Sequence, residues 1–133
     1  MTAEMDRLGN LAEAILGAWN TQDVEQVLDC YTADLTYLDP NTHGPVVGRE
    51  AMRAYLTKLF DRWTMTWKGG EMLQLEGGEG VVIHWTATLT PTGSENSIEI
   101  AGLDLVILEG DLVKRNEVYF DRAALGALLS TGV

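Results

Sequence analysis

Apolar residues recur every three or four positions in the first part of the chain. Over residues 4–20 this spacing predicts an amphipathic helix with one core-facing stripe. The stripe consists of Met5, Leu8, Ala12, Ile15 and Trp19. Asp23, with Gln26 three positions later, is typical of a capping box and opens a second, short helix through Tyr31. The apolar spacing from Met52 to Trp63 predicts a third helix over residues 49–62.

The pattern then changes from helical to alternating. A short strand over residues 35–38 precedes a turn, and four longer segments in the second half are rich in Val, Ile, Thr, Trp and Tyr. These segments are residues 64–76, 80–90, 97–109 and 112–120. Short glycine-containing turns between them make the strands antiparallel neighbours. Helices followed by such a meander predict an α+β domain, with the helices packed on one face of a bent sheet.

Composition limits what this domain does. With 133 residues, of which 46% are apolar, the chain is expected to form a single domain over residues 1–133. Its formal charge of −11 repels phosphate backbones and anionic lipids, so neither nucleic acid nor a membrane is an expected partner. No apolar run approaches the roughly 20 residues that span a bilayer, and the N-terminus lacks a signal pattern, so a cytoplasmic location is expected. The one cysteine, Cys30, suits a small buried hydrophobe better than a nucleophile.

Asp39 is the first candidate for chemistry, because it follows the short strand directly and would lie at the lip of a hydrophobic cavity. A carboxylate in such a place is costly unless water, hydrogen bonds or a ligand compensate it, which makes Asp39 a candidate catalytic residue. The alternative is structural. The sequence from Asp39 to Gly44 is typical of a turn, in which the aspartate hydrogen-bonds its own backbone.

Asp104 is the second candidate. It is the only charged residue on its face of the strand that spans residues 98–108, and that strand is apolar on both faces, so it is expected to be central and buried. Burial would raise the pKa of Asp104 unless a cation lies close. A neutral acid there would donate a hydrogen bond to an oxyanion, while Asp39 acts as base. Alternatively, Tyr, Trp or His neighbours, or Arg115 on the next strand, satisfy a purely structural aspartate.

Aromatic side chains are core residues by default, but some would line a cavity and contact a substrate. The candidate substrate-binding residues are Trp19, Tyr31, Tyr55, Trp63, His84 and Phe120. A lone strand histidine such as His84 is more often a wall residue than a base. Two histidines without HxH or HExxH spacing give no support for a metal, so no metal or other cofactor is expected. Whether Glu117 and Asp121 face the pocket stays open.

Four motifs carry a resemblance to a known family. They begin at Asp23 (Asp-Val-Glu-Gln-Val-Leu-Asp-Cys-Tyr-Thr-Ala-Asp), Tyr37 (Tyr-Leu-Asp-Pro), Gly48 (Gly-Arg-Glu-Ala-Met) and Val118 (Val-Tyr-Phe-Asp-Arg-Ala-Ala-Leu). Together they resemble the nuclear-transport-factor-2-like (NTF2-like) superfamily, in its ketosteroid isomerase and SnoaL-like polyketide cyclase branch. The resemblance covers nearly the whole chain and is more specific for fold than for reaction. It implies an NTF2-like cone: a strongly curved mixed or antiparallel sheet wrapped around three N-terminal helices, with an apolar pocket and often a homodimer.

The resemblance also implies roles for the two acids. Asp39 matches the position of the isomerase base and Asp104 that of its neutral oxyanion donor. Ile15 stands where the isomerase has a tyrosine donor, and Gly102 stands where limonene-type epoxide hydrolases have an arginine. Polyether-forming cyclases therefore resemble this chain better, since an acid pair in an apolar cavity suits ring closure.

The expected function is that of a cofactor-independent acid/base isomerase or cyclase. Its substrate would be a hydrophobic, polyketide-like small molecule, and ring closure would form a polyether or pyran. The alternative is a non-catalytic protein that binds a small molecule or serves as a dimerisation module.

Overall fold

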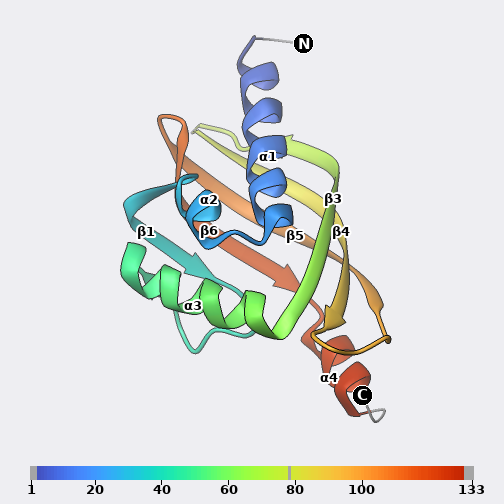
Figure 1. Cartoon of the computed structure of the whole chain (residues 1–133). Helices are drawn as coiled ribbons and strands as arrows, with labels where there is room; N and C mark the ends of the chain where they lie inside the picture. The colour runs from blue at the N-terminus through green and yellow to red at the C-terminus, as the bar shows by residue number, and fades with distance from the viewer. Residues whose placement is uncertain (1–2, 78, 131–133) are drawn as a thin grey trace.

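Three helices precede most of the sheet in the computed structural model, which describes residues 3–77 and 79–130. Helix α1 spans Ala3–Thr21, α2 spans Val24–Leu28 and α3 spans Arg49–Arg62. The predicted stripe of α1 is buried from Leu8 to Trp19, as its three- and four-residue spacing requires. Figure 1 shows α1 and α3 lying on the same side of the sheet. The helical half of the expected α+β fold is therefore confirmed.

The sheet has six strands in the order β2-β1-β6-β5-β4-β3. Their bounds are β1 Tyr31–Leu38, β2 Val46–Val47, β3 Trp63–Gln74, β4 Gly80–Pro91, β5 Ile98–Glu109 and β6 Leu112–Phe120. Neighbours from β3 to β6 are antiparallel, whereas β1 pairs with β6 in parallel. The strongly curved sheet and the helices give the expected cone, and Figure 1 shows the long strands bending around the helical layer. Helix α4, Arg122–Ser130, lies at one end of the sheet.

The second helix is shorter than its apolar residues suggest. It ends at Leu28, and Tyr31 begins β1, so the prediction of a helix through Tyr31 is wrong. Val27, Leu28 and Tyr31 are all fully buried, and a helix turn followed at once by a strand buries them as well as a longer helix would. The predicted cap is present, because Oδ1 of Asp23 accepts hydrogen bonds from the backbone N–H groups of Glu25 and Gln26.

Strict alternation along the central strands decides which side chains reach the interior. In β4, Ile83, Trp85 and Ala87 are buried, while His84 and Thr86 are exposed on the outer face. Strand β5 lies between β4 and β6, as its apolar character on both faces predicts. Its inner face carries Asp104, which is therefore enclosed between the sheet and the helices.

Candidate functional site

Asp104 lies in the middle of β5 with 7% of its surface exposed. Its Oδ1 accepts a hydrogen bond of 2.7 Å from Nε1 of Trp85, and its Oδ2 accepts a longer one of 3.4 Å from Nδ2 of Asn116. Burial raises the pKa of Asp104 to about 6; the two donors oppose this rise, and the negative charge of Asp39 adds to it. Asp104 therefore changes its protonation state close to neutral pH.

A chain of hydrogen bonds orients one of the two donors to Asp104. Nε1 of Trp19 donates to the Tyr31 hydroxyl at 3.2 Å, and that hydroxyl donates to Oδ1 of Asn116 at 2.7 Å. With its oxygen occupied in this way, the Asn116 amide presents its Nδ2 to Asp104 and to the Leu105 carbonyl. Tyr31 and Asn116 are completely or almost completely buried. The N–H groups that reach Asp104 are thus held by buried polar contacts rather than by solvent.

The other donor is placed by a glycine. A Cβ on Gly102 would lie only 2.4 Å from Cη2 and 2.5 Å from Cζ2 of Trp85, and 2.7 Å from the Tyr119 carbonyl oxygen. Gly102 pairs with Trp85 across β4 and β5, two residues before Asp104. Because no Cβ intervenes, the indole packs directly against the Gly102 backbone, and its Nε1 donates to the Asp104 carboxylate.

Asp39 lies at the end of β1 and is also 7% exposed. Its Oδ1 accepts hydrogen bonds from the backbone N–H groups of Asn41 at 2.7 Å and Thr42 at 3.1 Å. Its Oδ2 accepts hydrogen bonds from the hydroxyls of Tyr37, at 2.7 Å, and Tyr55. The turn interpretation of Asp39 and its burial beside the cavity are therefore both correct. Four donors occupy the four lone-pair positions of this carboxylate.

The tyrosines that hold Asp39 are themselves poor acids. Burial and the adjacent Asp39 charge raise the pKa of Tyr37 and of Tyr55 well above the ordinary value. Both hydroxyls thus remain protonated at any physiological pH, and both donate to Asp39. Tyr37 also stacks on Trp19, with ring centroids 5.8 Å apart. The aromatic wall therefore links the surroundings of the two acids.

Two small cavities lie inside the cone. The inner cavity has a volume of about 40 Å³ and is lined by aromatic and aliphatic side chains together with Asp39. A second space of about 20 Å³ is lined by Asp104. Both are lined by Trp19, Tyr37, Trp67 and Val118. Each holds about one water molecule, whereas pockets for small ligands measure about 300 Å³ or more. A ligand that contacts both acids therefore has to displace the aromatic wall between them.

A larger hollow lies outside the inner cavity. It has a volume of about 510 Å³ and shares four lining residues with the inner cavity, Asn41, Leu59, Trp63 and Leu125. We call this hollow the mouth. It lies between α3, α4 and the loop after Asp39, and its remaining lining residues are His43, Tyr55, Lys58, Arg62, Arg122 and Gly126. The two hollows form a path from the surface to Asp39.

The candidate substrate-binding residues fall into four places. Trp19, Trp63 and Phe120 line the inner cavity, and Tyr55 lines the mouth. Tyr31 lies deeper and orients Asn116. The structure does not bring His84 to the interior, because alternation along β4 turns Ile83 and Trp85 inward and His84 outward. His84 lies instead beside an open hollow on the outer face of the sheet.

Glu117 of β6, and Asp121 just after this strand, stay outside the cone. Glu117 accepts hydrogen bonds from Arg115 and from the Tyr119 hydroxyl on the outer face, and Asp121 caps the start of α4 through the Ala123 N–H. Arg115 therefore pairs with Glu117 and does not satisfy Asp104. The inward face of β6 contributes Asn116 and Val118 instead.

The sequence did not predict three residues that donate hydrogen bonds to the two acids, namely Tyr37, Trp85 and Asn116. The local sequence around Tyr37 and Trp85 predicts only core aromatic residues, because it does not show that their polar groups meet a carboxylate. The position of Asn116 could have been predicted, because alternation places its amide on the same face as Val118 and Phe120. A single polar residue among inward apolar ones indicates a buried partner.

Within residues 3–77 and 79–130, no group of three or more His, Cys, Asp or Glu side chains is arranged to hold a metal ion. No helix in the same described portion is both long and apolar enough to cross a membrane.

The sequence profile of the SnoaL-like domain matches residues 12–116. This span includes both acids and every strand except the end of β6. The chain therefore belongs to the SnoaL-like domain family. No curated protein sequence matches the chain.

Solved structures share the fold at low sequence identity. A putative polyketide cyclase from Xanthomonas campestris pv. campestris is 17% identical, with 96% of this chain and 99% of that chain covered and a TM-score of 0.80. An NTF2-like protein of unknown function from Burkholderia pseudomallei is 18% identical, with 94% and 98% covered and a TM-score of 0.80. SalBIII, an epoxide hydrolase/cyclase-like enzyme of pyran ring formation in the polyether salinomycin, is 21% identical, with 92% and 96% covered and a TM-score of 0.78. The chain's structural neighbours thus include a putative polyketide cyclase and an epoxide hydrolase/cyclase-like enzyme.

Proposed function

We propose that the protein is an acid/base isomerase or cyclase that acts on a hydrophobic, oxygen-bearing small molecule of the polyketide type without a cofactor. The observation that carries this proposal is the Asp104 carboxyl, which is buried among apolar groups and has a pKa of about 6. A buried acid without a cationic partner reduces stability, so its presence is best explained by proton transfer. The ring-closing activity stated for SalBIII supports the cyclase form of the proposal.

The geometry favours a different division of roles from the one that the resemblance implies. Asp104 is the base, because its carboxylate has only two donors, one of them at 3.4 Å, and so keeps lone pairs for a substrate proton. Asp39 has four donors and acts as a fixed acceptor that holds the Tyr37 and Tyr55 hydroxyls in the cavity wall. In ring closure, Asp104 takes the proton of a substrate hydroxyl as the oxygen attacks, and returns it to the carbon or oxygen that gains the electron pair.

The test uses a panel of apolar ζ-hydroxy-α,β-enones. Attack of the ζ-oxygen on the β-carbon closes a tetrahydropyran, and the hydroxyl proton is returned to the α-carbon. Turnover followed by chromatography is expected to rise with pH through a pKa near 6, because the ionised Asp104 is the base. Asp104→Asn is expected to lower kcat by about 100-fold or more, the range for loss of a general base.

Glu117→Gln is the matched control, since it removes an acid on the outer face and is expected to leave turnover unchanged. Wild-type turnover in Asp104→Asn, or a rate independent of pH between 5 and 8, would reject this mechanism.

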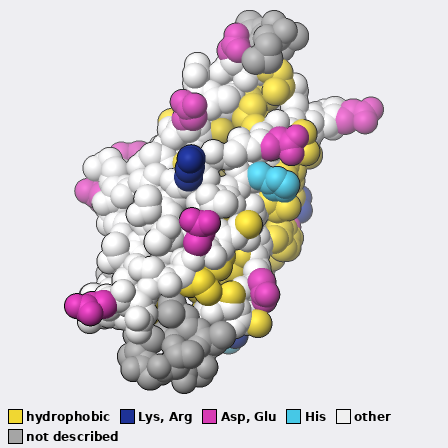
Figure 2. All heavy atoms as spheres, turned by 90° about the vertical axis from the view of Figure 1, so that its right-hand side faces the viewer, with side chains coloured by type: hydrophobic (Ala, Val, Ile, Leu, Met, Phe, Trp, Pro, Cys, Tyr) yellow, Lys and Arg dark blue, Asp and Glu magenta, His cyan; other side chains and the backbone are white. Residues whose placement is uncertain are grey.

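The alternative function is a non-catalytic binding or dimerisation protein. The small volume of the inner cavities favours the dimerisation form of this alternative, because the structure as it stands admits no large ligand. The outer face of the sheet favours it too, since Leu103 and Leu105 of β5 and the half-exposed Tyr119 of β6 lie there. Figure 2 shows hydrophobic side chains gathered in a strip on the side of the molecule that carries β3 and β4. We propose that the chain forms a homodimer through this outer face, whichever function holds.

A further inference from the structure

The mouth of the cavity gathers positive charge on an acidic protein. The chain has nine Lys and Arg side chains against twenty Asp and Glu, yet three of the nine, Lys58, Arg62 and Arg122, line this one hollow together with His43. Its lining includes no Asp or Glu from the described part of the chain. Such a local concentration is opposite in sign to the rest of the molecule.

The cations of the mouth differ in their partners from four of the six other Lys and Arg side chains; Arg49 and Lys68 also form no ion pair within the part of the chain that the structure describes. Arg7, Arg53, Lys114 and Arg115 each form an ion pair with a carboxylate. Among the described residues, Lys58, Arg62 and Arg122 form none. Arg122 donates to Oδ1 of Asn41 at 2.8 Å, and its charge stays uncompensated. Three cations without a carboxylate partner that line one hollow on an acidic chain indicate a site for an external anion.

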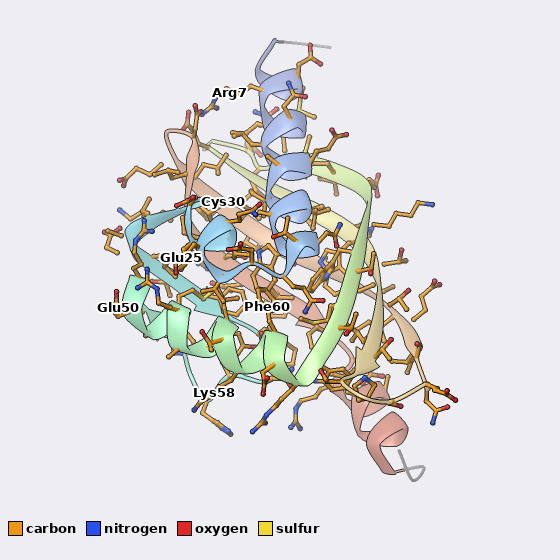
Figure 3. All side chains as sticks on the ribbon, viewed as in Figure 1. Arg7, Glu25, Cys30, Glu50, Lys58 and Phe60 are labelled. Atoms are coloured by element: carbon orange, nitrogen blue, oxygen red, sulfur yellow. The ribbon has the colours of Figure 1, made fainter. Side chains whose placement is uncertain are left out.

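Their positions on the fold direct the three charges to one place. Lys58 and Arg62 are four residues apart on α3 and so lie on the same side of the helix. Figure 3 shows Lys58 projecting from the side of α3 that faces away from α1, at the end of the molecule where α4 lies. Arg122 is the first residue of α4. The charges therefore approach the mouth from two elements.

The lining changes from positively charged at the mouth to apolar in the inner cavity, and this change determines which end of a ligand enters first. Beyond the mouth the lining is aromatic and aliphatic, and the two acids at its inner end repel an anion. We propose that the natural ligand is an apolar molecule that carries an anionic head group. The head group binds to Lys58, Arg62 and Arg122, while the apolar body displaces the aromatic wall of the inner cavity, whose present volume is about 40 Å³. This inference rests on the proposed function in that both place a hydrophobic molecule in the cone, and it adds the charge and direction of that molecule.

The experiment measures binding without turnover. The probes are 11-(dansylamino)undecanoic acid and its methyl ester, which differ only in the anionic head group, and fluorescence titration gives both dissociation constants. The acid is expected to bind about tenfold more tightly than the ester at low salt, the size expected from several partly exposed charge pairs, and to lose this advantage as salt screens them. Equal binding of acid and ester would overturn the proposal.

The decisive variant is Lys58→Gln/Arg62→Gln/Arg122→Gln, in which the acid and the ester are expected to bind equally. The control, Arg7→Gln/Arg53→Gln/Lys114→Gln, removes the same charge away from the mouth and is expected to retain the preference. Equal loss in both variants would show that only net charge matters and would also overturn the proposal. The dansylated decyl phosphate monoester distinguishes the sources of the anion: tighter binding than the carboxylate indicates a phosphorylated ligand, and weaker binding a carboxylic acid.

Failure of this inference is separable from failure of the proposed function. Asp104→Asn is expected to bind the probes as the wild type does, because Asp104 lies beyond the mouth. Equal binding of the acid and the ester by the wild type, together with normal pH-dependent turnover, would reject the anionic head group alone. A retained preference in a protein without turnover would leave the binding site valid and reject the chemistry.

Discussion

Burial of the Asp104 side chain costs the folded protein stability. Removing the carboxyl from water disfavours its charged form, and the N–H donors of Trp85 and Asn116 compensate only in part. The folded protein therefore holds a proton on Asp104 at pH values where an unfolded chain has released it. This difference between the two states makes the role of Asp104 measurable without a substrate.

Stability is expected to depend on pH through Asp104 with a defined sign. Its pKa rises from 3.8 to about 6 on folding, so between these values the folded state binds more protons and stability falls as pH rises. The full effect is about 3 kcal/mol above pH 6, from about 2 pKa units. In Asp104→Asn this loss is absent, so the variant gains stability relative to the wild type as pH rises from 4 to 7. Urea unfolding at several pH values measures the difference.

Glu117→Gln serves as the comparison here as well. Hydrogen bonds from Arg115 and Tyr119 lower the pKa of Glu117, so this carboxylate adds stability to the folded protein as pH rises. Glu117→Gln is therefore expected to lose stability relative to the wild type as pH rises, which is the opposite of Asp104→Asn. A stability difference between Asp104→Asn and the wild type that stays constant from pH 4 to 7 would show that Asp104 titrates normally.

At the scale of elements, the contact between β4 and β5 is what places a donor on Asp104. The indole of Trp85 occupies the space that a side chain at position 102 would fill. Trp85 also packs edge-on against Phe120 of β6, with ring centroids 6.3 Å apart. Residues of three adjacent strands therefore surround the Trp85 indole. This packing requires that position 102 carry no Cβ.

Gly102→Ala is expected to displace Trp85 and to destabilise the protein by about 1–3 kcal/mol, since the new methyl group overlaps both the indole and the Tyr119 carbonyl. Loss of the indole donor would also raise the pKa of Asp104. Urea unfolding gives the first effect, and the pH profile of turnover gives the second.

The matched control is Gly17→Ala in α1, where nothing lies within 4 Å of the added Cβ. This change is expected to stabilise the helix by about 0.5–1 kcal/mol. A harmless Gly102→Ala would show that Trp85 has room to move and that β5 does not fix its position.

At the scale of the whole molecule, the two faces of the sheet differ in whether other elements cover them. The inner face of the sheet is covered by the helices, whereas the outer face carries the open hollow beside His84, Leu103 and Tyr119. The outer face exposes apolar side chains that include Leu103, Leu105 and Tyr119. A contiguous apolar patch of this kind is typical of a protein–protein interface. The proposed homodimer would bury it.

Leu103→Asp is expected to convert a dimer into a monomer, because a charge at the centre of an apolar interface stays unpaired and desolvated. Light scattering after size-exclusion chromatography, at several protein concentrations, measures the mass. Val47→Asp is the control, since Val47 is 61% exposed on β2 at the other end of the sheet. A wild-type monomer at every concentration would reject the dimer.

Much of this architecture is determined by the sequence alone, because periodicity is a local property. The spacing in α1 and α3 and the alternation along the long strands predict those elements to within a few residues. Alternation also placed Asp104 on an apolar face, and the turn residues after Asp39 predicted its backbone hydrogen bonds.

The tertiary structure decided what local patterns do not contain. Tyr31 became the start of β1 because burial next to β6 outweighed the helical continuation of α2. The partners of Asp39 and Asp104 come from strands and helices far apart in sequence, so only packing reveals that Trp85 and Asn116, not Arg115, meet Asp104. Hydrophobic pattern fixes which face of an element is buried, but the pairing of individual polar groups depends on how the buried faces meet.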